Sequence, residues 1–354
     1  MAFLIISPTG KKYLFDAGAR KDYWNYSPMI RERFRKGVNV GGMRVTKGVA
    51  ELLREGGVGV EEGEVEGVFW SHWHFDHIGD MSTFPSSTKI IVGPGFSDAM
   101  LPGYPANPDS PLLESDYVNH EMQELTFTTP LEIGGFRAID YFADGSLYIL
   151  DVPGHAIGHI CALVRTTPDT FVLLGADACH FAGSLRPSVW VPLPESVTRE
   201  ELGEVQGGGC PCEDFLVSHP RGKEGRIKPW YSASRTPGSA YADWRVADRS
   251  VEKLRGFDAC VDVLVCLAHD PGVGEVLPVF NGEGIKGGGI GKWKERGWKE
   301  KLRWRFLGEL PRMVGGEGGK GRGWVRGREP IVEGWWRGGK RVGVEEALRR
   351  DGEE

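Results

Sequence analysis

Short apolar runs, separated by glycine, proline and charged residues, recur along most of the chain. Phe3 to Ile6 and Lys12 to Phe15 flank the turn sequence Ser7-Pro8-Thr9-Gly10, and this pattern predicts a β-hairpin. A third apolar run, Val65 to Trp70, leads directly into Ser71-His72. We expect a buried strand here, and polar residues at the end of such a strand are candidates for a functional site.

The same pattern predicts further elements. Strands rich in β-branched or aromatic residues are expected at Lys89 to Val92, Phe136 to Tyr141, Leu147 to Val152, Ile160 to Arg165, Phe171 to Leu174 and Val261 to Leu267. Helices are expected at Val49 to Arg54, Ser196 to Val205 and Ala247 to Leu254. Because strands dominate and helices are interspersed, the pattern favours a sheet-centred α/β layered architecture.

Composition narrows the possible partners and compartments. The 354 residues can bury a large core without disulfides, and the six cysteines are scattered, as is usual in a reducing compartment. Met1 to Ser7 lacks the features of a signal peptide, and no stretch approaches the roughly 20 apolar residues of a membrane span. The formal net charge of -6 gives no basic field for nucleic acid. We therefore expect a cytoplasmic protein with no membrane or nucleic-acid partner.

Two glycine-rich regions are interpreted as unstructured. From residue 311 to 354 the chain is a mixture of Gly, Arg, Glu and Trp, which predicts a mostly disordered tail. Contact of its Arg and Trp residues with RNA or another partner is the alternative. Gly282-x-Gly284-x-x-Gly287 has the spacing of a dinucleotide-binding loop, but no βαβ pattern follows it, so we expect a flexible loop.

The stretch His72-Trp73-His74-Phe75-Asp76-His77 carries the most informative chemistry. Four potential metal ligands alternate with two aromatic residues that can pack inward. Three imidazoles and a carboxylate crowded together would be poorly satisfied without a cation, and neutral imidazole is a common zinc ligand. A polar loop with chance histidines is the alternative, but the whole chain has only nine histidines.

This stretch resembles the metallo-β-lactamase superfamily, whose signature is His-x-His-x-Asp-His after a core strand. Further segments resemble those of the family and occur in the same order. Leu14 to Gly18 resembles its early strand and turn, and Asp151 to His155 resembles the segment with the next histidine. Leu173 to Asp177 resembles the strand that ends in the bridging aspartate, and Val263 to Asp270 resembles the final strand. The resemblance covers roughly residues 3–310. It implies a catalytic domain over 1–310 with a four-layer αββα fold, in which two mixed β-sheets pack face to face with helices outside.

The resemblance also implies the metal ligands. One zinc ion would be held by His72, His74 and His155, a second by Asp76, His77 and His269, and Asp177 would bridge them. Asp76 would additionally orient a hydroxide and pass a proton to the leaving group. His159 and His180 are candidates for a position behind the ligands or in the pocket, with an ordinary hydrogen-bonded histidine as the alternative.

The implied activity is hydrolysis. The chain looks most like the N-acyl homoserine lactonase-type branch and its fungal relatives, which implies attack of a metal-bridging hydroxide on a lactone or a related cyclic ester, carbamate or lactam. An insertion at 180–260 is expected to cover the site. Its aromatic residues either line an apolar substrate pocket or pack against the core: Trp190, Trp230, Tyr231, Tyr241 and Trp244.

Two alternatives use similar ligands. A thioesterase of the glyoxalase II-like or acyl-carrier type would use the same two metals on a thioester, whereas a persulfide-oxidising enzyme would use a single iron. In either hydrolytic case the expected partner is a small molecule with a hydrolysable carbonyl. The sequence does not indicate an oligomeric state.

Overall fold

Two β-sheets form the centre of the structure, a computed structural model that describes residues 1–38, 40–203, 210–280, 289–310, 312–314, 323–325 and 334–352. The first sheet has the order β1 (Phe3–Ile6), β2 (Lys12–Phe15), β3 (Gly67–Phe69), β4 (Lys89–Val92), β5 (Met122–Glu124). The second has the order β13 (Val263–Leu267), β10 (Thr170–Ala176), β9 (Ile160–Thr167), β8 (Leu147–Asp151), β7 (Phe136–Asp140), β6 (Glu132–Ile133).

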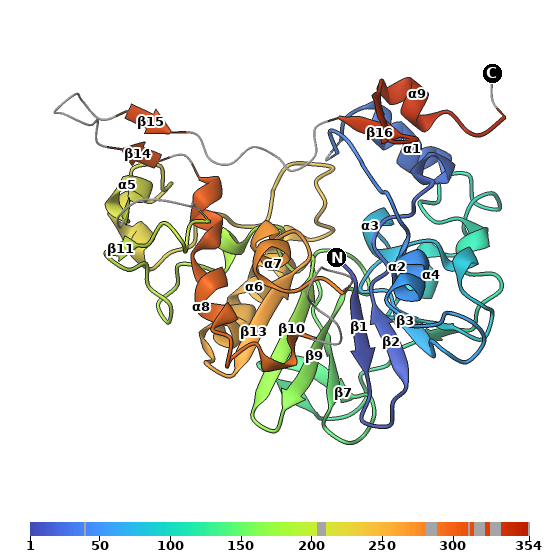
Figure 1. Cartoon of the computed structure of the whole chain (residues 1–354), viewed down its shortest axis with the longest axis horizontal. Helices are drawn as coiled ribbons and strands as arrows, with labels where there is room; N and C mark the ends of the chain where they lie inside the picture. Colours follow the sequence, from blue (N-terminus) through green and yellow to red (C-terminus); the bar gives the residue numbers. More distant parts are fainter. Residues whose placement is uncertain are drawn as a thin grey trace.

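Both sheets are mixed. In the first, β1 and β2 form the expected antiparallel hairpin, and β2 to β5 pair in parallel. In the second, β10 pairs in parallel with β13, while β6 to β10 are antiparallel. Figure 1 shows the two sheets beside each other.

Alternation of side chains along the strands explains why the sheets stack. On β3 and β4, Phe69 and Ile91 enter the core between the two sheets, where they meet Leu174 of β10. Their neighbours Val68 and Ile90 face the opposite side and contribute to a second core. Each strand therefore buries both of its faces, as its almost continuous apolar sequence predicts.

Helices cover the outer faces. α2 (Val49–Glu55) buries Leu53 in the outer core of the first sheet, and α6 (Trp244–Ala259) buries Val251 and Leu254 in the outer core of the second. The arrangement is the expected four-layer αββα fold, which is confirmed. The remaining α-helices among the described residues are α1 (Pro28–Arg35), α3 (Phe75–Ile78), α4 (Phe96–Met100), α5 (Glu213–Leu216), α7 (Pro271–Val276), α8 (Trp298–Arg303) and α9 (Val344–Leu348).

The helix expected at Ser196 to Val205 is wrong over the described residues 196–203. Its first two residues form β11 (Ser196–Val197), which pairs with β12 (Cys210–Pro211). The Thr198 hydroxyl accepts a hydrogen bond from the Glu201 backbone N–H at 3.1 Å, while the Glu201 carboxylate accepts one from the Thr198 backbone N–H at 2.7 Å. This reciprocal pair closes a local turn, and Gly203 at φ 81 leaves the helical region.

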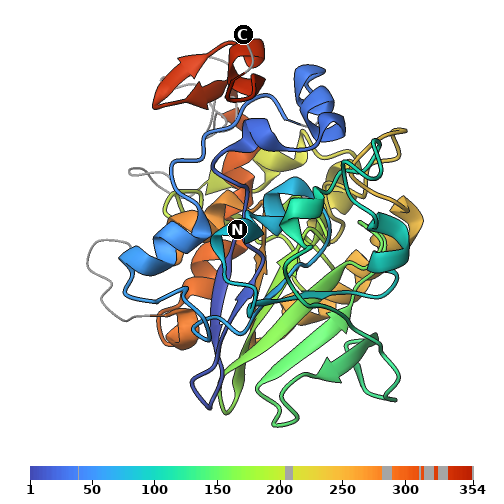
Figure 2. The same ribbon diagram turned by 90° about the vertical axis from the view of Figure 1, so that its right-hand side faces the viewer.

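The end of the chain is folded where the structure describes it. β16 (Trp335–Arg337) and β17 (Lys340–Val342) form a hairpin that is followed by α9, and Figure 2 shows both beside α1. Trp335 is buried against Tyr23 and Phe34. Over residues 334–352 this differs from the disorder expected for the tail, because the apolar partners come from the other end of the chain.

Two other regions bear on the sequence-based expectations. Residues 312–314 and 323–325 form the paired strands β14 and β15. The glycine-rich Gly282 to Gly287 lies outside the described residues. Among the helices that the structure describes, none is long and apolar enough to span a membrane.

Candidate metal centre

The chemistry-bearing residues lie where core strands of both sheets end. His72 follows β3, Asp177 follows β10 directly, and His269 lies two residues beyond β13. These strands carry buried apolar residues up to their last positions. Because the ends of β3, β10 and β13 meet at one edge of the stacked sheets, residues about 100 positions apart in the sequence come into contact.

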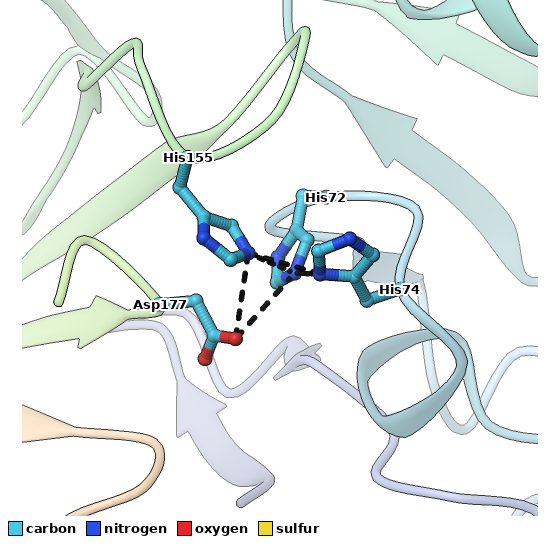
Figure 3. A group of neighbouring side chains, drawn as sticks. All are labelled: His72, His74, His155 and Asp177. Carbon is cyan, nitrogen blue, oxygen red and sulfur yellow. Dashed lines mark hydrogen bonds and ion pairs between the residues drawn. The ribbon is translucent and has the colours of Figure 1, made fainter. Parts of the chain in front are cut away.

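Three imidazoles and one carboxylate form the first cluster (Figure 3). His72 Nε2 lies 2.8 Å from His74 Nδ1, and His155 Nε2 lies 3.0 Å and 2.9 Å from these two atoms. Asp177 Oδ2 is 3.7 Å from His72 Nε2 and 3.5 Å from His155 Nε2. Two nitrogens on one tetrahedral zinc ion would be about 3.3 Å apart, so the nitrogens lie at nearly the separation of ligands to a common ion.

Asp76, His77 and His269 form a second cluster against the same aspartate. His269 Nε2 lies 3.3 Å from Asp76 Oδ2 and 3.2 Å from Asp177 Oδ2. His77 Nε2 lies 3.1 Å from the other carboxylate oxygen, Asp177 Oδ1. Asp177 therefore touches both clusters, and the structure brings together all seven residues that the resemblance implied.

Burial and charge make this site suitable for cations. Burial, with further repulsion from neighbouring imidazoles, lowers the pKa of His72 well below its usual range, and burial lowers the pKa of His74 to about 4. Although burial opposes ionisation of Asp177, His77 and the other histidine contacts hold its pKa well below its usual range. In the second cluster burial opposes protonation, but the carboxylates of Asp177, Asp16 and Asp76 raise the pKa of His77 well above its usual range, and those of Asp177 and Asp76 raise the pKa of His269 to about 9. Imidazoles bind metals in their neutral form, so a metal bound there would replace the protons of these two histidines.

Unpaired atoms support the same interpretation. His77 Nε2 and Asp177 Oδ1 are buried and 3.1 Å apart, but neither forms a hydrogen bond of good geometry, with the other or with any other described residue. A buried polar atom without a partner is destabilising by roughly 1–3 kcal/mol. A divalent cation between the clusters would satisfy both atoms, so the residues present fit a metal centre.

Asp16 contacts the metal-binding loop through Ser71 and His77, and the sequence did not assign it a role in the site. It follows β2 directly and adopts φ 61, which is unusual for a residue other than glycine. Its carboxylate accepts hydrogen bonds from the Ser71 backbone N–H at 2.8 Å and lies 2.7 Å from His77 Nδ1. A carboxylate on the far nitrogen of an imidazole orients the ring and fixes its tautomer. The sequence signals were an aspartate that ends an apolar strand and the resemblance of Leu14 to Gly18 to the family's early strand and turn, which assigned Asp16 no role.

The backbone of Gly154 lies close to the start of α6, and this contact positions the neighbouring His155. Gly154 has φ 122, and a Cβ atom there would lie 2.2 Å from the Ala247 backbone nitrogen of α6. The Asp243 N–H donates to the Gly154 carbonyl at 2.9 Å, and the Ala242 N–H donates to the His155 carbonyl at 2.8 Å. The segment that begins α6 thus fixes the backbone of this imidazole, and only glycine permits the contact.

The two less certain histidines take different places. His159 lies behind the cluster, with its ring centroid 5.3 Å from that of His72 and its Nδ1 2.9 Å from the Val152 carbonyl. The His180 side chain is 32% exposed; its Nε2 is 3.0 Å from Asp177 Oδ2 and its Nδ1 is 3.0 Å from the Tyr241 hydroxyl.

The aromatic residues of the segment that was expected to cover the site also differ in their surroundings. Tyr241 reaches the centre, with its ring centroid 5.3 Å from that of His155. Trp230 is buried in the core against His219 and Phe306, and Trp190 is exposed. Packing against the core is therefore the correct interpretation for Trp230.

Comparisons with known proteins agree with the geometry. The family model described as the metallo-beta-lactamase superfamily matches residues 2–183. Metallo-hydrolase mfmC of Annulohypoxylon moriforme is 38% identical over 312 residues, which cover 86% of this chain and 78% of that protein. Gamma-lactamase MBL2 of Gibberella moniliformis is 41% identical over 247 residues, which cover 68% of this chain and 99% of that protein.

A second gamma-lactamase and a solved structure are also similar. Gamma-lactamase FDB1 of Fusarium pseudograminearum is 38% identical over 320 residues, covering 87% of this chain and 74% of that protein. A crystal structure of a B. thuringiensis AiiA mutant with N-decanoyl-L-homoserine bound at the active site has a TM-score of 0.49 and 17% identity, covering 79% of this chain and 85% of that chain.

Proposed function

Because this chain belongs to the metallo-β-lactamase superfamily and is a metal-dependent hydrolase, we propose that it opens a lactone or a related cyclic ester, carbamate or lactam with two zinc ions. The proposed ligands are those of the two clusters described above: His72, His74 and His155 for one ion, Asp76, His77 and His269 for the other, and Asp177 for both. The observation that carries this proposal is the position of Asp177, which contacts both clusters through its carboxylate.

The donor set supports zinc in particular. Five imidazoles and two carboxylates supply nitrogen and oxygen ligands, and no cysteine belongs to the clusters. Bound zinc ions would lower the pKa of water to about 7 and polarise a carbonyl, which provides both partners of a hydrolysis reaction. His269 and Asp76 are the more exposed members of the site, so the substrate is expected to enter on their side.

Asp76 is the proposed proton-transfer group. Burial opposes its ionisation, but His77 and His269 lower its pKa, so this carboxylate is ionised at neutral pH. As a base it can orient a nucleophilic water, and it can then carry the proton to the leaving oxygen or nitrogen of the opened ring. His180 and Tyr241 lie beside Asp177 and are partly exposed, so they can donate a hydrogen bond that orients a substrate carbonyl.

The proposed substrate class is based on the names of proteins similar to this chain. Two of the proteins similar to this chain are named gamma-lactamases, and both are at least 38% identical to it. A cyclic amide or ester is therefore the first class to test. The metal chemistry alone would serve a thioester equally well, and the walls of the site decide between them.

The decisive experiment combines metal analysis with a substrate screen of the purified full-length protein. We expect about two zinc ions per chain and turnover of an aryl lactam or acyl lactone above that of thioesters and phosphodiesters. Asp177→Ala and His269→Ala should each lose turnover and bound zinc. Full activity in either variant would refute the proposed centre, and preferential thioester turnover would refute the substrate class.

A further inference from the structure

A cavity lies away from the metal centre and is lined by residues of the segment between Asp177 and His269. Its volume is about 680 Å³, within the range of roughly 300–1,000 Å³ that is typical of small-molecule sites. None of the seven proposed ligands lines it. One wall is a face of α6, with Asp248, Glu252 and Arg255 spaced by one helical turn each.

The rim of this cavity is aromatic and exposed. Trp190 is 56% exposed and Tyr231 is 48% exposed, although side chains of this size are usually buried. Trp190 is held at the tip of a tight turn, in which the Ser188 N–H donates to the Val191 carbonyl at 3.0 Å and the Val191 N–H donates to the Ser188 hydroxyl at 3.1 Å. The ring is thus presented to solvent by an ordered loop.

Positive charge dominates the lining. The cavity is lined by four cationic residues, Arg221, Lys228, Arg235 and Arg255, and by two acidic residues, Asp248 and Glu252. The carboxylates are already engaged, because Asp248 accepts the Ala233 N–H at 2.8 Å and Glu252 pairs with Arg255.

Two of the other cations are available for a ligand, because Arg221 and Lys228 form no ion pair with any described residue. The third, Arg235, already lies over the Trp244 ring, 4.5 Å from its centroid. Four cations minus two carboxylates leave a formal charge of +2 in a chain whose net charge is -6. This local excess is the opposite of what the composition of the whole chain predicts.

We propose that this cavity binds small aromatic anions, in particular aromatic carboxylates, at a site separate from the metal centre. The exposed rings of Trp190 and Tyr231 offer faces for stacking, and Lys228 and Arg221 offer charge-assisted hydrogen bonds to a carboxylate. An aromatic cation would meet repulsion, and a neutral aromatic compound would gain only the stacking.

One aromatic contact joins the cavity to the chain segment that carries His180. The ring centroid of Tyr231 lies 5.1 Å from that of Phe181, which follows His180 in the sequence. Opening an aryl lactone or lactam creates a carboxylate, so the reaction product would belong to the class of ligand that fits the cavity. This last link depends on the proposed function, whereas the binding of aromatic anions does not.

Isothermal titration calorimetry of the metal-loaded full chain at low ionic strength tests the proposal. The probes are 1-naphthoate, 1-naphthylmethylamine and 1-naphthalenemethanol, which share one ring system and differ in charge. We expect 1-naphthoate to bind most tightly. Lys228→Glu and Trp190→Ala should each weaken its binding by about tenfold.

The matched control is Lys223→Glu, which reverses a charge in the 3-10 helix Gly222–Arg226 that precedes Lys228, at a residue that does not line the cavity. Lys223→Glu should leave the affinity for 1-naphthoate unchanged. Equal binding of the amine and the carboxylate, or 1-naphthoate binding that is insensitive to Lys228→Glu, would overturn the proposal. If 1-naphthoate binding is insensitive to Lys228→Glu and is lost when a chelator removes the metal ions, its carboxylate binds at the metal centre. None of these outcomes depends on whether the protein hydrolyses a lactam.

Discussion

Asp16 Oδ2 lies 2.7 Å from Nδ1 of His77, so a residue at the end of β2 holds an imidazole that belongs to α3. The other carboxylate oxygen accepts the N–H of Ser71 at 2.8 Å. One buried side chain thereby ties the loop after β3 to the first sheet. The orientation of His77 toward Asp177 depends on this connection.

Replacement of this carboxylate should weaken metal binding. We expect Asp16→Asn to lower zinc affinity by about 10–100-fold, since the amide cannot supply the charge that orients and polarises His77. Asparagine tolerates positive φ, so the backbone at φ 61 is preserved. Competition with a chromophoric chelator measures the affinity. Asp144→Asn, in an exposed turn, is the control, and equal affinities in the two variants would contradict the role of Asp16.

The Tyr241 hydroxyl should contribute to turnover without contributing to metal content. Tyr241→Phe removes the group 3.0 Å from His180 Nδ1, which leaves that imidazole free to rotate beside Asp177. We expect kcat on a cyclic ester or amide to fall about tenfold with zinc content unchanged. Tyr231→Phe, in the same segment but against Phe181, should retain full kcat. A similar loss in both variants would argue against a specific role for Tyr241.

The C-terminal hairpin should stabilise the metal-binding loop. The Trp335 ring lies 5.4 Å from that of Phe34, and the Phe34 ring lies 4.9 Å from that of Phe75, between His74 and Asp76. Trp335→Ala should lower the free energy of unfolding by about 3–5 kcal/mol and also weaken zinc affinity.

Urea denaturation and zinc competition measure these two effects. Trp190→Ala provides the comparison, because that exposed ring should change stability by no more than about 0.5 kcal/mol. A Trp335→Ala protein as stable as Trp190→Ala would show that the hairpin contributes nothing to the fold.

A buried charge cluster should make stability depend on pH. Arg20 lies within ion-pair distance of three carboxylates, those of Asp22, Asp80 and Asp116. Burial raises the pKa of Asp116 to about 7, although Arg20 opposes the shift. The folded state thus retains a proton that the unfolded state releases near pH 4, so this group's stabilising contribution is lost as the pH rises to 7.

Asparagine at this position cannot ionise and should remove that dependence. The stability of Asp116→Asn relative to the parent protein should improve between pH 5 and pH 8, as measured by urea denaturation at each pH. Asp109→Asn, in an exposed loop, should show no such trend. A difference between Asp116→Asn and the parent that is constant with pH would contradict the assigned pKa.

Local sequence determined the strands, the hairpin and the cluster of ligands from His72 to His77, whereas His155, Asp177 and His269 were implied by the resemblance to the family. Apolar runs such as Val65 to Trp70 predict a buried strand without reference to the rest of the chain, and the spacing of His72 to His77 concentrates ligands within one loop. These properties depend on neighbours in the sequence, so they can be recognised from it.

Only the tertiary structure decided the roles of residues whose partners are distant. Asp16 is 61 positions from His77, Tyr241 is 61 positions from His180, and Trp335 is buried against residues near the other end of the chain. A glycine-rich tail with few apolar residues predicts disorder unless another segment buries them. Whether a side chain is buried, paired or exposed depends on surfaces that exist only after the chain has folded, and for that reason no local pattern encodes it.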